Sequence, residues 1–522
     1  MSLKGAHQSA SRLLTGAAGL AGVAVITQWS TGLIYFGGDA LMALLYLAAW
    51  LLAIRIGRSL SAPAVRRSDV WTPLDWFLVA TAGAATLSTL LAINQWTGSL
   101  ALGIWQVDLS PSGRPYGNLA QPNHLSTACF LGLCCASWLH ERKRIDRLTY
   151  WVLVATLCVG VAMTGSRTGW LQVGLLVTAV AVTSRAIPSA RIGPRSAAAV
   201  ALVFVLFAAA WPPLDELVRG GSGRSFDAML EGGTRLKHWS AMFKAALDRP
   251  LTGYGWQQVS VAQIEHAAEN PAVGENIEHS HNLVLDLIVW NGFPVGLALV
   301  ALLGWWLLRH VGLARKPNHR WAVIALLGLL LHALLEYPLE YAYFLVPAGV
   351  LIGTLDRVLE DSGAAPEQAD GYWRSGATVL LLAVCAVGYE YARIETAFTT
   401  MRLELARVGN PTQLTPLPDV QLLTQLQGLM QLAHSRARPS MSATEIDFMR
   451  KTSARYSYPP AMLRYALAAG LNGRGAEATR TLVRLCKIHE PRRCGEAHEN
   501  WLSAEQTYPV LRGLAPPDWP TP

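Results

Sequence analysis

The sequence predicts an all-α, polytopic membrane-spanning helical bundle with a large external loop and a C-terminal helical domain. Three observations predict this class. Hydrophobic residues make up 52% of the 522 residues and charged residues only 15%, which is too apolar for an ordinary soluble domain. The apolar residues are grouped in runs that approach or reach the length of a membrane-spanning helix. Basic residues alternate between rich and poor connectors along the chain.

The apolar runs predict about eleven to twelve spans, several of them near the short end of what a bilayer needs. Only helices satisfy their own backbone groups in hydrocarbon, so each run is expected to be helical. Residues 281–308 are long for one span and contain Asn-Gly-Phe-Pro, so they form either one tilted helix or a half-span and a full span. The runs are residues 13–27, 33–54, 74–93, 124–139, 148–163, 169–184, 197–211, 281–308, 321–335, 341–355 and 376–390.

Lysines and arginines between the runs predict the topology, because basic connectors stay on the cytoplasmic side. Four connectors carry three or four Lys or Arg each, at residues 55–73, 140–147, 184–196 and 309–320. Three of the alternating connectors carry at most one. The N-terminus is therefore expected inside and the C-terminus outside. This topology accounts for the net charge of +8, so no nucleic-acid partner is predicted.

The expected domains are a membrane domain over residues 1–390, with external loops at 94–123 and 212–280, and a helical external domain over residues 391–522. Within the tail, residues 459–491 read as helix, Asn-Gly-Arg-Gly turn and helix, bounded by prolines. This hairpin resembles one TPR-like repeat, without a second clear copy. Cys486 and Cys494 lie in the exported tail, where an oxidising compartment would permit a disulfide.

Polar and ionisable residues gather at or near the external ends of the predicted spans. Such groups are costly near a membrane, so their position is informative. We find no equivalent set at the cytoplasmic ends, which predicts a cavity open to the external side. The alternative is that helix ends are simply polar. The set comprises Asp39, Arg167, Gln172, His281, His332, Glu336, Tyr337 and Glu340.

Two arginines are candidate anion ligands. Arg167 lies in TGSRTGW, a short turn between two spans, where a guanidinium fork and the amides of the next helix would bind phosphate oxygens. Arg235 lies in the first turn of a predicted amphipathic helix that lies along the membrane surface and ends before Pro250. The alternatives are that Arg167 only anchors a helix end and that Arg235 is an ordinary solvated charge.

The stretch ENIEHSHNLVLDL, residues 275–287, predicts a proton acceptor at His281. His281 is expected to begin a helix, whose N-terminus disfavours an imidazolium and leaves a neutral ring, as a general base requires. One alternative is a helix-cap histidine at the interface. Another is a metal site of Glu278, His279 and His281, although its spacing and the lack of an acidic cluster count against it. The short cytoplasmic connectors hold no phosphate loop or nucleotide motif.

These motifs, together with YGNLAQPNHLST at residues 116–127 and HSHNLVLDLIVWNGFPVG from residue 279, resemble the bacterial PglL-type O-linked oligosaccharyltransferases. That family is related to the O-antigen ligases (WaaL) and O-antigen polymerases (Wzy), and the GNLAQPNH segment is typical of its protein-glycosylating branch. The resemblance implies transfer of a preassembled oligosaccharide from undecaprenyl diphosphate to a hydroxyl acceptor. It places the multi-pass chain in the bacterial inner membrane, with the active site on the periplasmic face.

The resemblance also implies roles for individual residues. His281 would activate the acceptor, and Arg167 and Arg235 would hold the diphosphate. Weaker substrate-binding candidates are Asn123, His124, His279, Glu336 and Tyr337. No metal or other cofactor is implied. One departure is that Gly292 is followed by Phe-Pro-Val-Gly rather than the family's shorter glycine step, which affects the expected helix geometry there.

The expected reaction is glycosylation of Ser or Thr in an exported, pilin-like protein, by direct attack with inversion at the sugar. The partners are then the lipid-linked donor, the acceptor protein and membrane lipid. One alternative is an O-antigen ligase or polymerase that acts on lipid A-core or glycan hydroxyls. A second is a lipid-linked glycan transporter, which would need ionisable residues at mid-membrane and on both sides. A third is an interaction scaffold that works through the tail.

Overall fold

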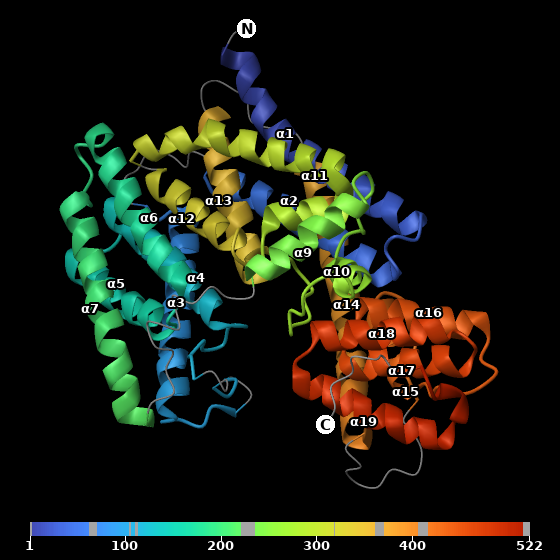
Figure 1. Cartoon of the computed structure of the whole chain (residues 1–522). Helices are drawn as coiled ribbons and strands as arrows, with labels where there is room; N and C mark the ends of the chain where they lie inside the picture. The colour runs from blue at the N-terminus through green and yellow to red at the C-terminus, as the bar shows by residue number, and fades with distance from the viewer. Residues whose placement is uncertain are drawn as a thin grey trace. The chain divides into compact units, whose positions relative to one another are not determined.

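The computed structural model confirms the predicted helical class (Figure 1). It describes residues 3–61, 70–103, 106–109, 113–220, 235–317, 319–360, 370–405 and 416–514. These residues form 18 α-helices and no β-strand. They divide into two compact units, which are described separately below. Unit 1 comprises Met1–Gly16, Ala49–Gly232 and Leu302–Glu367, and unit 2 comprises Ala17–Ala48, Gly233–Ala301 and Gln368–Pro522.

Each predicted apolar run contains a helix, and the chain is a multi-pass membrane protein. Within the described residues, seven helices are long and apolar enough to cross a membrane, while α5 and α12 are shorter apolar helices. Three of the seven, α1 (Leu3–Ser30), α2 (Gly37–Leu60) and α11 (Leu283–His310), contain the boundary between the units. The other four are α3 (Pro73–Thr97), α6 (Arg167–Thr183), α7 (Pro194–Arg219) and α14 (Asp370–Leu405).

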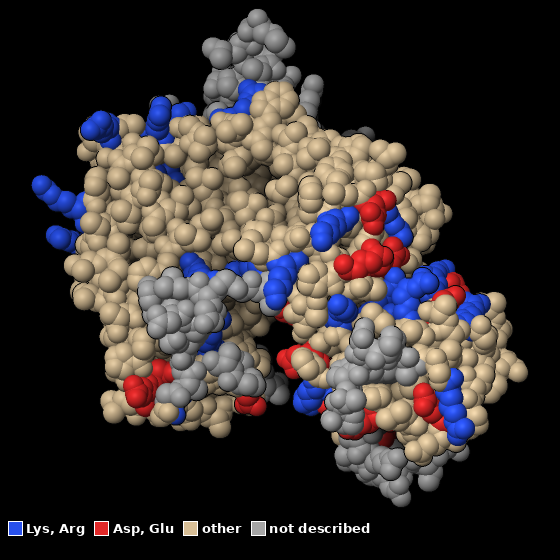
Figure 2. Space-filling view, viewed as in Figure 1, with Lys and Arg blue, Asp and Glu red and all other residues tan. Residues whose placement is uncertain are grey.

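Unit 1 is held together by a continuous apolar core. Its remaining helices are α4 (Pro122–Glu141), α5 (Arg147–Met163), α12 (Arg320–Ala333) and α13 (Ala342–Glu360). Buried Phe130, Trp138, Leu157, Leu329 and Leu351 belong to one cluster. On the face seen in Figure 2, the surface over α7 is largely uncharged between a basic end, where the helix begins, and an acidic end, where it finishes. This distribution fits the predicted topology, in which α7 follows the basic connector 184–196.

Buried ion pairs occupy the helix ends next to the basic connectors, so the expectation of no ionisable set at those ends was wrong. Arg58 Nη1 lies 3.3 Å from Asp356 Oδ2, and Arg320 Nη2 lies 2.6 Å from Glu141 Oε1. Asp75 accepts hydrogen bonds from both Arg142 and Arg144. The partners of each pair lie far apart in the sequence, which is why a scan along the sequence does not reveal them. Pairing offsets the cost of burying each charge and joins neighbouring helix ends.

Unit 2 contains the tail helices, drawn in orange and red in Figure 1. They are α15 (Thr424–His434), α16 (Ala443–Arg455), α17 (Pro459–Leu471), α18 (Gly475–Ile488) and α19 (Pro491–Thr507). The predicted hairpin is present as α17 and α18, and Cys486 and Cys494 form a disulfide. The tail core also includes Ile264 and Ala267 of α10 (Val259–Ala267), so part of the large loop packs with the tail.

Candidate active site

A buried carboxylate organises the polar residues of unit 1. Glu336 is 4% exposed and accepts hydrogen bonds from Asn123 Nδ2 at 2.8 Å and from Gln121 Nε2 at 3.2 Å. Gln121 Nε2 also lies 2.9 Å from Nε2 of His124, whose Nδ1 lies 2.6 Å from the hydroxyl of Tyr343. The structure therefore brings together three of the predicted residues, Asn123, His124 and Glu336, at the N-terminus of α4. Tyr337 follows Glu336 and stacks on Tyr341.

A second polar chain continues from this cluster between the helices of unit 1. Thr127 Oγ1 lies 2.8 Å from His332 Nδ1 and accepts a hydrogen bond of 2.9 Å from Gln172 Nε2. All three side chains are fully buried. Gln172 also donates to the carbonyl of Gly328 at 3.0 Å. These bonds satisfy Thr127 Oγ1, His332 Nδ1 and Gln172 Nε2, which would otherwise be costly inside a helical bundle, and they fix the α4, α6 and α12 faces against one another.

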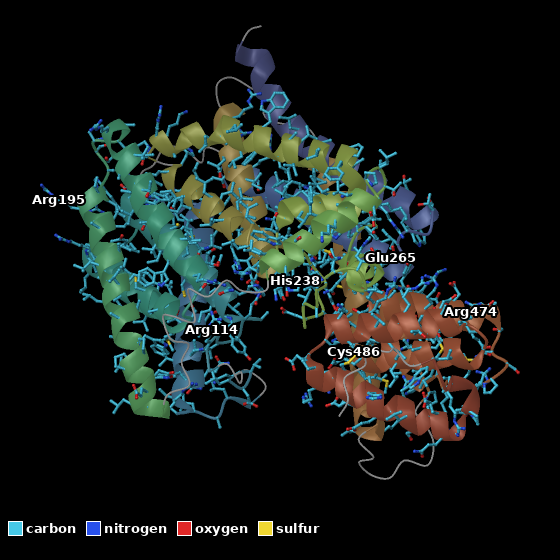
Figure 3. All side chains as sticks on the ribbon, viewed as in Figure 1. Arg114, Arg195, His238, Glu265, Arg474 and Cys486 are labelled. Carbon is cyan, nitrogen blue, oxygen red and sulfur yellow. A yellow bond between two sulfur atoms is a disulfide. The ribbon has the colours of Figure 1, made fainter. Side chains whose placement is uncertain are left out.

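Arg114 connects this cluster to the turn that carries Arg167. Its Nε donates to the carbonyl of Thr164 at 2.7 Å, and its Nη2 donates to Asn123 Oδ1 at 3.3 Å. Two residues after Thr164, the Ser166 side chain caps α6, which begins at Arg167. Arg114 therefore holds the backbone of the turn that precedes Arg167 against the N-terminus of α4. Arg114 (labelled in Figure 3) was not among the predicted site residues, although it is the single basic residue of connector 94–123, which was expected to be external.

In unit 2, His281 lies just before a helix rather than at its first residue. Asn282 Oδ1 accepts hydrogen bonds from the amides of Val284 and Leu285, so Asn282 is the cap and α11 begins at Leu283. His281 itself has a positive φ of 59°. The amide of Ser280 donates to Asp286 Oδ1 at 2.7 Å, which ties the histidine segment back to the first turn of α11. The predicted helix start at His281 was therefore wrong. Asn282 is the N-cap, a position that Asn strongly favours.

The residues of the alternative metal site have separate partners. Nδ1 of His279 lies 3.8 Å from Oδ2 of Asp286, which is buried. Glu278 accepts a hydrogen bond from the hydroxyl of Tyr458 in the tail. His281 instead stacks near another histidine, His238, with ring centroids 6.3 Å apart. The three side chains are therefore engaged in different directions, which disfavours a shared metal ion.

The predicted loop helix is present as α9 (Arg235–Asp248), and it ends before Pro250 as expected. Its buried face comprises His238, Ala241, Met242, Ala245 and Ala246. Arg235 lies one turn before His238, so both residues lie on the same side of α9. Phe243 and Leu247 are 49% and 54% exposed, and their placement on a membrane surface stays a prediction. His238 (labelled in Figure 3) was missed because its contact with His281 joins segments far apart in the sequence.

The segment after α9 docks on a break in α11. Gly292 has non-helical angles, and Pro294 has no amide hydrogen, so carbonyls in this turn lack their helical donors. The backbone amide of Tyr254 donates instead to the carbonyl of Val289 at 2.8 Å, and the backbone amide of Gly255 donates to the carbonyl of Trp290 at 3.0 Å. The amide of Phe293 in turn donates to Pro250 O at 2.7 Å. This backbone clamp joins the DRPLTGYGW and VWNGFP segments. Leu283–His310 consists of two helical segments that meet at a kink at Gly292, and how they span the membrane stays a prediction.

Gly292→Ala is expected to destabilise unit 2 by about 2 kcal/mol or more. A Cβ at this position would lie 2.6 Å from the carbonyl carbon of Leu251, and the φ of 72° is unfavourable for alanine. Thermal unfolding of the purified protein measures the effect. Gly304→Ala in the same helix is the matched control, because nothing lies within 4 Å of its added Cβ. Equal melting temperatures for the two variants would contradict the clamp.

Three family models match successive parts of the chain. "Protein glycosylation ligase" matches residues 115–140, "O-Antigen ligase" matches residues 152–300, and "Virulence factor membrane-bound polymerase, C-terminal" matches residues 320–506. A "General O-oligosaccharyltransferase" of Acinetobacter baylyi is 28% identical over 477 residues, which cover 89% of this chain and 81% of that protein. A "ComP-specific O-oligosaccharyltransferase" of the same organism is 29% identical over 332 residues, covering 63% of this chain and 59% of that protein.

Over most of its length the chain is similar to the PglL-type O-oligosaccharyltransferases of the O-antigen ligase family. It is therefore a membrane glycosyltransferase that uses a glycan donor and a protein acceptor. The matched regions contain the predicted catalytic, diphosphate-binding and substrate-binding residues. Asn123 and His124 lie in the protein glycosylation ligase match, and Arg167, Arg235 and His281 lie in the O-antigen ligase match.

The tail of this oligosaccharyltransferase holds the histidine segment in place within unit 2. Arg455 of α16 donates to both carboxylate oxygens of Asp39, each at 3.1 Å. The next residues continue the attachment, since Ser457 Oγ bonds Asn276 Oδ1 at 2.5 Å and Tyr458 bonds Glu278. From the other side, Gln263 bonds the backbone of Glu275 and Ile277. Residues 275–280 are thus fixed by α10 and by the α16 to α17 turn.

Proposed function

We propose that this oligosaccharyltransferase transfers a preassembled oligosaccharide from undecaprenyl diphosphate to Ser or Thr of exported, pilin-like proteins, on the periplasmic face of the inner membrane. The observation that carries the proposal is the position of His281. It precedes the Asn282 cap of α11 and stacks beside the α9 face that also carries Arg235. The name of the ComP-specific relative supports a pilin as the acceptor.

The residues match the demands of the reaction. A serine or threonine hydroxyl is a poor nucleophile and needs a positioned base, which His281 would supply. The lipid diphosphate is a fair leaving group that needs its developing charge stabilised, and guanidinium groups and helix N-terminal amides do this. Arg167 at the start of α6 and Arg235 at the start of α9 are the proposed ligands. Direct attack by the hydroxyl on the sugar carbon would invert its configuration.

Transfer by the purified protein tests this proposal. A lipid-linked oligosaccharide and a purified pilin are supplied in detergent with EDTA, and the glycosylated pilin is measured by mass spectrometry. We expect full transfer with EDTA present, because the proposed mechanism uses no metal. Loss of transfer on EDTA alone, with recovery on adding a divalent cation, would contradict the metal-independent mechanism.

Arg167→Ala is expected to lower the rate of transfer roughly a hundredfold, as for the loss of one transition-state charge donor. Arg167→Lys is expected to recover only part of the rate, because an ammonium lacks the planar fork that binds two phosphate oxygens. Single-turnover kinetics with saturating donor measure both variants. Transfer at the wild-type rate by Arg167→Ala would show that Arg167 acts only as a helix-end anchor, and a lysine variant with the full rate would show that the planar fork is not needed.

The O-antigen ligase match over residues 152–300 favours one second candidate, in which the same site serves a sugar hydroxyl on lipid A-core or on a growing glycan. Co-expression with a lipid-linked glycan and a pilin separates the two functions. We expect glycan on the pilin. Glycan found only on lipopolysaccharide would favour the ligase.

A further inference from the structure

His238 is a buried histidine whose hydrogen-bonding state is set by a carboxylate. Its side chain is 2% exposed, and its Nε2 lies 3.3 Å from Oε2 of Glu275. An ionised carboxylate can only accept a hydrogen bond, so Nε2 of His238 carries the hydrogen. In a neutral imidazole the other nitrogen, Nδ1, then has a lone pair and acts as an acceptor. The His238–Glu275 pair therefore fixes a proton-accepting nitrogen within the protein.

This nitrogen has no hydrogen-bond partner among the residues that the structure describes, and it is buried. Buried polar atoms are nearly always satisfied, since leaving one unpaired is costly. The ring of His238 also lies beside that of His281, with 6.3 Å between the centroids and 22° between the planes. An unsatisfied acceptor thus lies next to the proposed base.

We propose that Nδ1 of His238 accepts a hydrogen bond from a hydroxyl of the bound substrate, beside His281. The inference rests on the proposed function, since it assigns a second substrate-binding residue to the same site. Hydroxyl groups are present both on the sugar of the donor and on the acceptor side chain. In either case the bond would orient the substrate relative to His281, and Glu275 would hold the ring in the required tautomer.

Two amide substitutions test the roles of the two nitrogens of His238 one at a time. Asparagine places its amide near the position of Nδ1 and can still accept the substrate hydroxyl, but it does not reach Glu275. Glutamine places its amide near the position of Nε2 and can still donate to Glu275, but it leaves no acceptor at Nδ1. Phenylalanine keeps the ring and its stacking while removing both nitrogens.

We expect His238→Phe and His238→Gln to lower kcat/KM for transfer about tenfold, the effect of one lost hydrogen bond at a desolvated site. His238→Asn is expected to retain most of the wild-type value. The assay uses the purified full-length protein, a lipid-linked oligosaccharide and a pilin, and each substrate is titrated separately. A higher KM for the pilin would place the hydroxyl on the acceptor, and a higher KM for the lipid would place it on the donor sugar.

The reverse order, with Gln active and Asn impaired, would overturn the inference and leave His238 a structural partner of Glu275. Wild-type kcat/KM in all three variants would also overturn it. His266→Asn is the matched control, because His266 is a buried histidine of α10 with partners at both nitrogens, Tyr254 and Asp248. It should lower the melting temperature without changing kcat/KM. If the wild-type protein itself transfers no glycan, the proposed function fails, and that result is distinct from failure of this inference alone.

Discussion

His281→Ala is expected to lower the rate of glycan transfer by roughly 10²- to 10⁴-fold, the usual contribution of a general base. The acceptor hydroxyl would still bind, but nothing would remove its proton as the new bond forms. Binding of the lipid-linked donor should change little, because the proposed diphosphate ligands are Arg167 and Arg235. Single-turnover transfer and a separate donor-binding measurement distinguish these two effects.

A second substitution, His281→Asn, controls for misfolding caused by the change at this position. His281 has a φ of 59°, a region that asparagine adopts more readily than alanine. His281→Asn should therefore keep the wild-type melting temperature and be as inactive as His281→Ala. Transfer at the wild-type rate in a folded His281→Asn protein would end the assignment of His281 as the base.

Arg455→Ala is expected to destabilise unit 2 by about 3–5 kcal/mol, because it leaves a buried carboxylate without its partner. The side chains of Arg455 and Asp39 are only 8% and 1% exposed. Burial opposes the charge of Arg455, but the neighbouring Asp39 raises its pKa above the ordinary value. The loss should also lower transfer, because the residues that follow Arg455 hold the segment that leads to His281.

Arg438→Ala is the matched control for this prediction. Arg438 also pairs with a carboxylate in the tail, that of Glu445, but both side chains are largely exposed, so loss of this pair is expected to change the stability little. Asp39→Asn combined with Arg455→Met should regain most of the stability, since it removes both buried charges. Thermal unfolding of the purified variants tests the prediction, and equal losses for Arg455→Ala and Arg438→Ala would contradict it.

Local patterns in the sequence predicted much of the fold. Apolar runs predicted the spanning helices, Pro250 predicted the end of α9, and the Asn-Gly-Arg-Gly turn predicted the α17 to α18 hairpin. These features depend on neighbouring residues and on the bilayer. The start of α11 was misplaced by two residues, because the cap is Asn282 rather than His281. The break at Gly292 was anticipated, but its clamp by the segment after α9 was not.

The candidate site was predictable only in part, because its contacts join distant segments. Asn123 and Glu336 were selected separately, and the structure shows that they are hydrogen-bonded. Arg114 and His238 were not selected, since each looks like an ordinary charged or polar loop residue until its partner is known. The paired charges next to the basic connectors were missed for the same reason. Composition and periodicity indicate where a polar residue is costly, whereas tertiary structure decides which partner offsets that cost.

The central claim is that His281, Arg235 and Arg167 act on one lipid diphosphate. An experimental structure of the full-length protein with a bound, non-hydrolysable lipid-linked oligosaccharide tests it most directly, by measuring the distances from the diphosphate oxygens to the two guanidinium groups. We predict hydrogen bonds from both arginines, with the His281 imidazole beside the reacting sugar carbon. A diphosphate bound away from Arg167 and Arg235, or an imidazole outside the cavity that holds the sugar, would contradict the account.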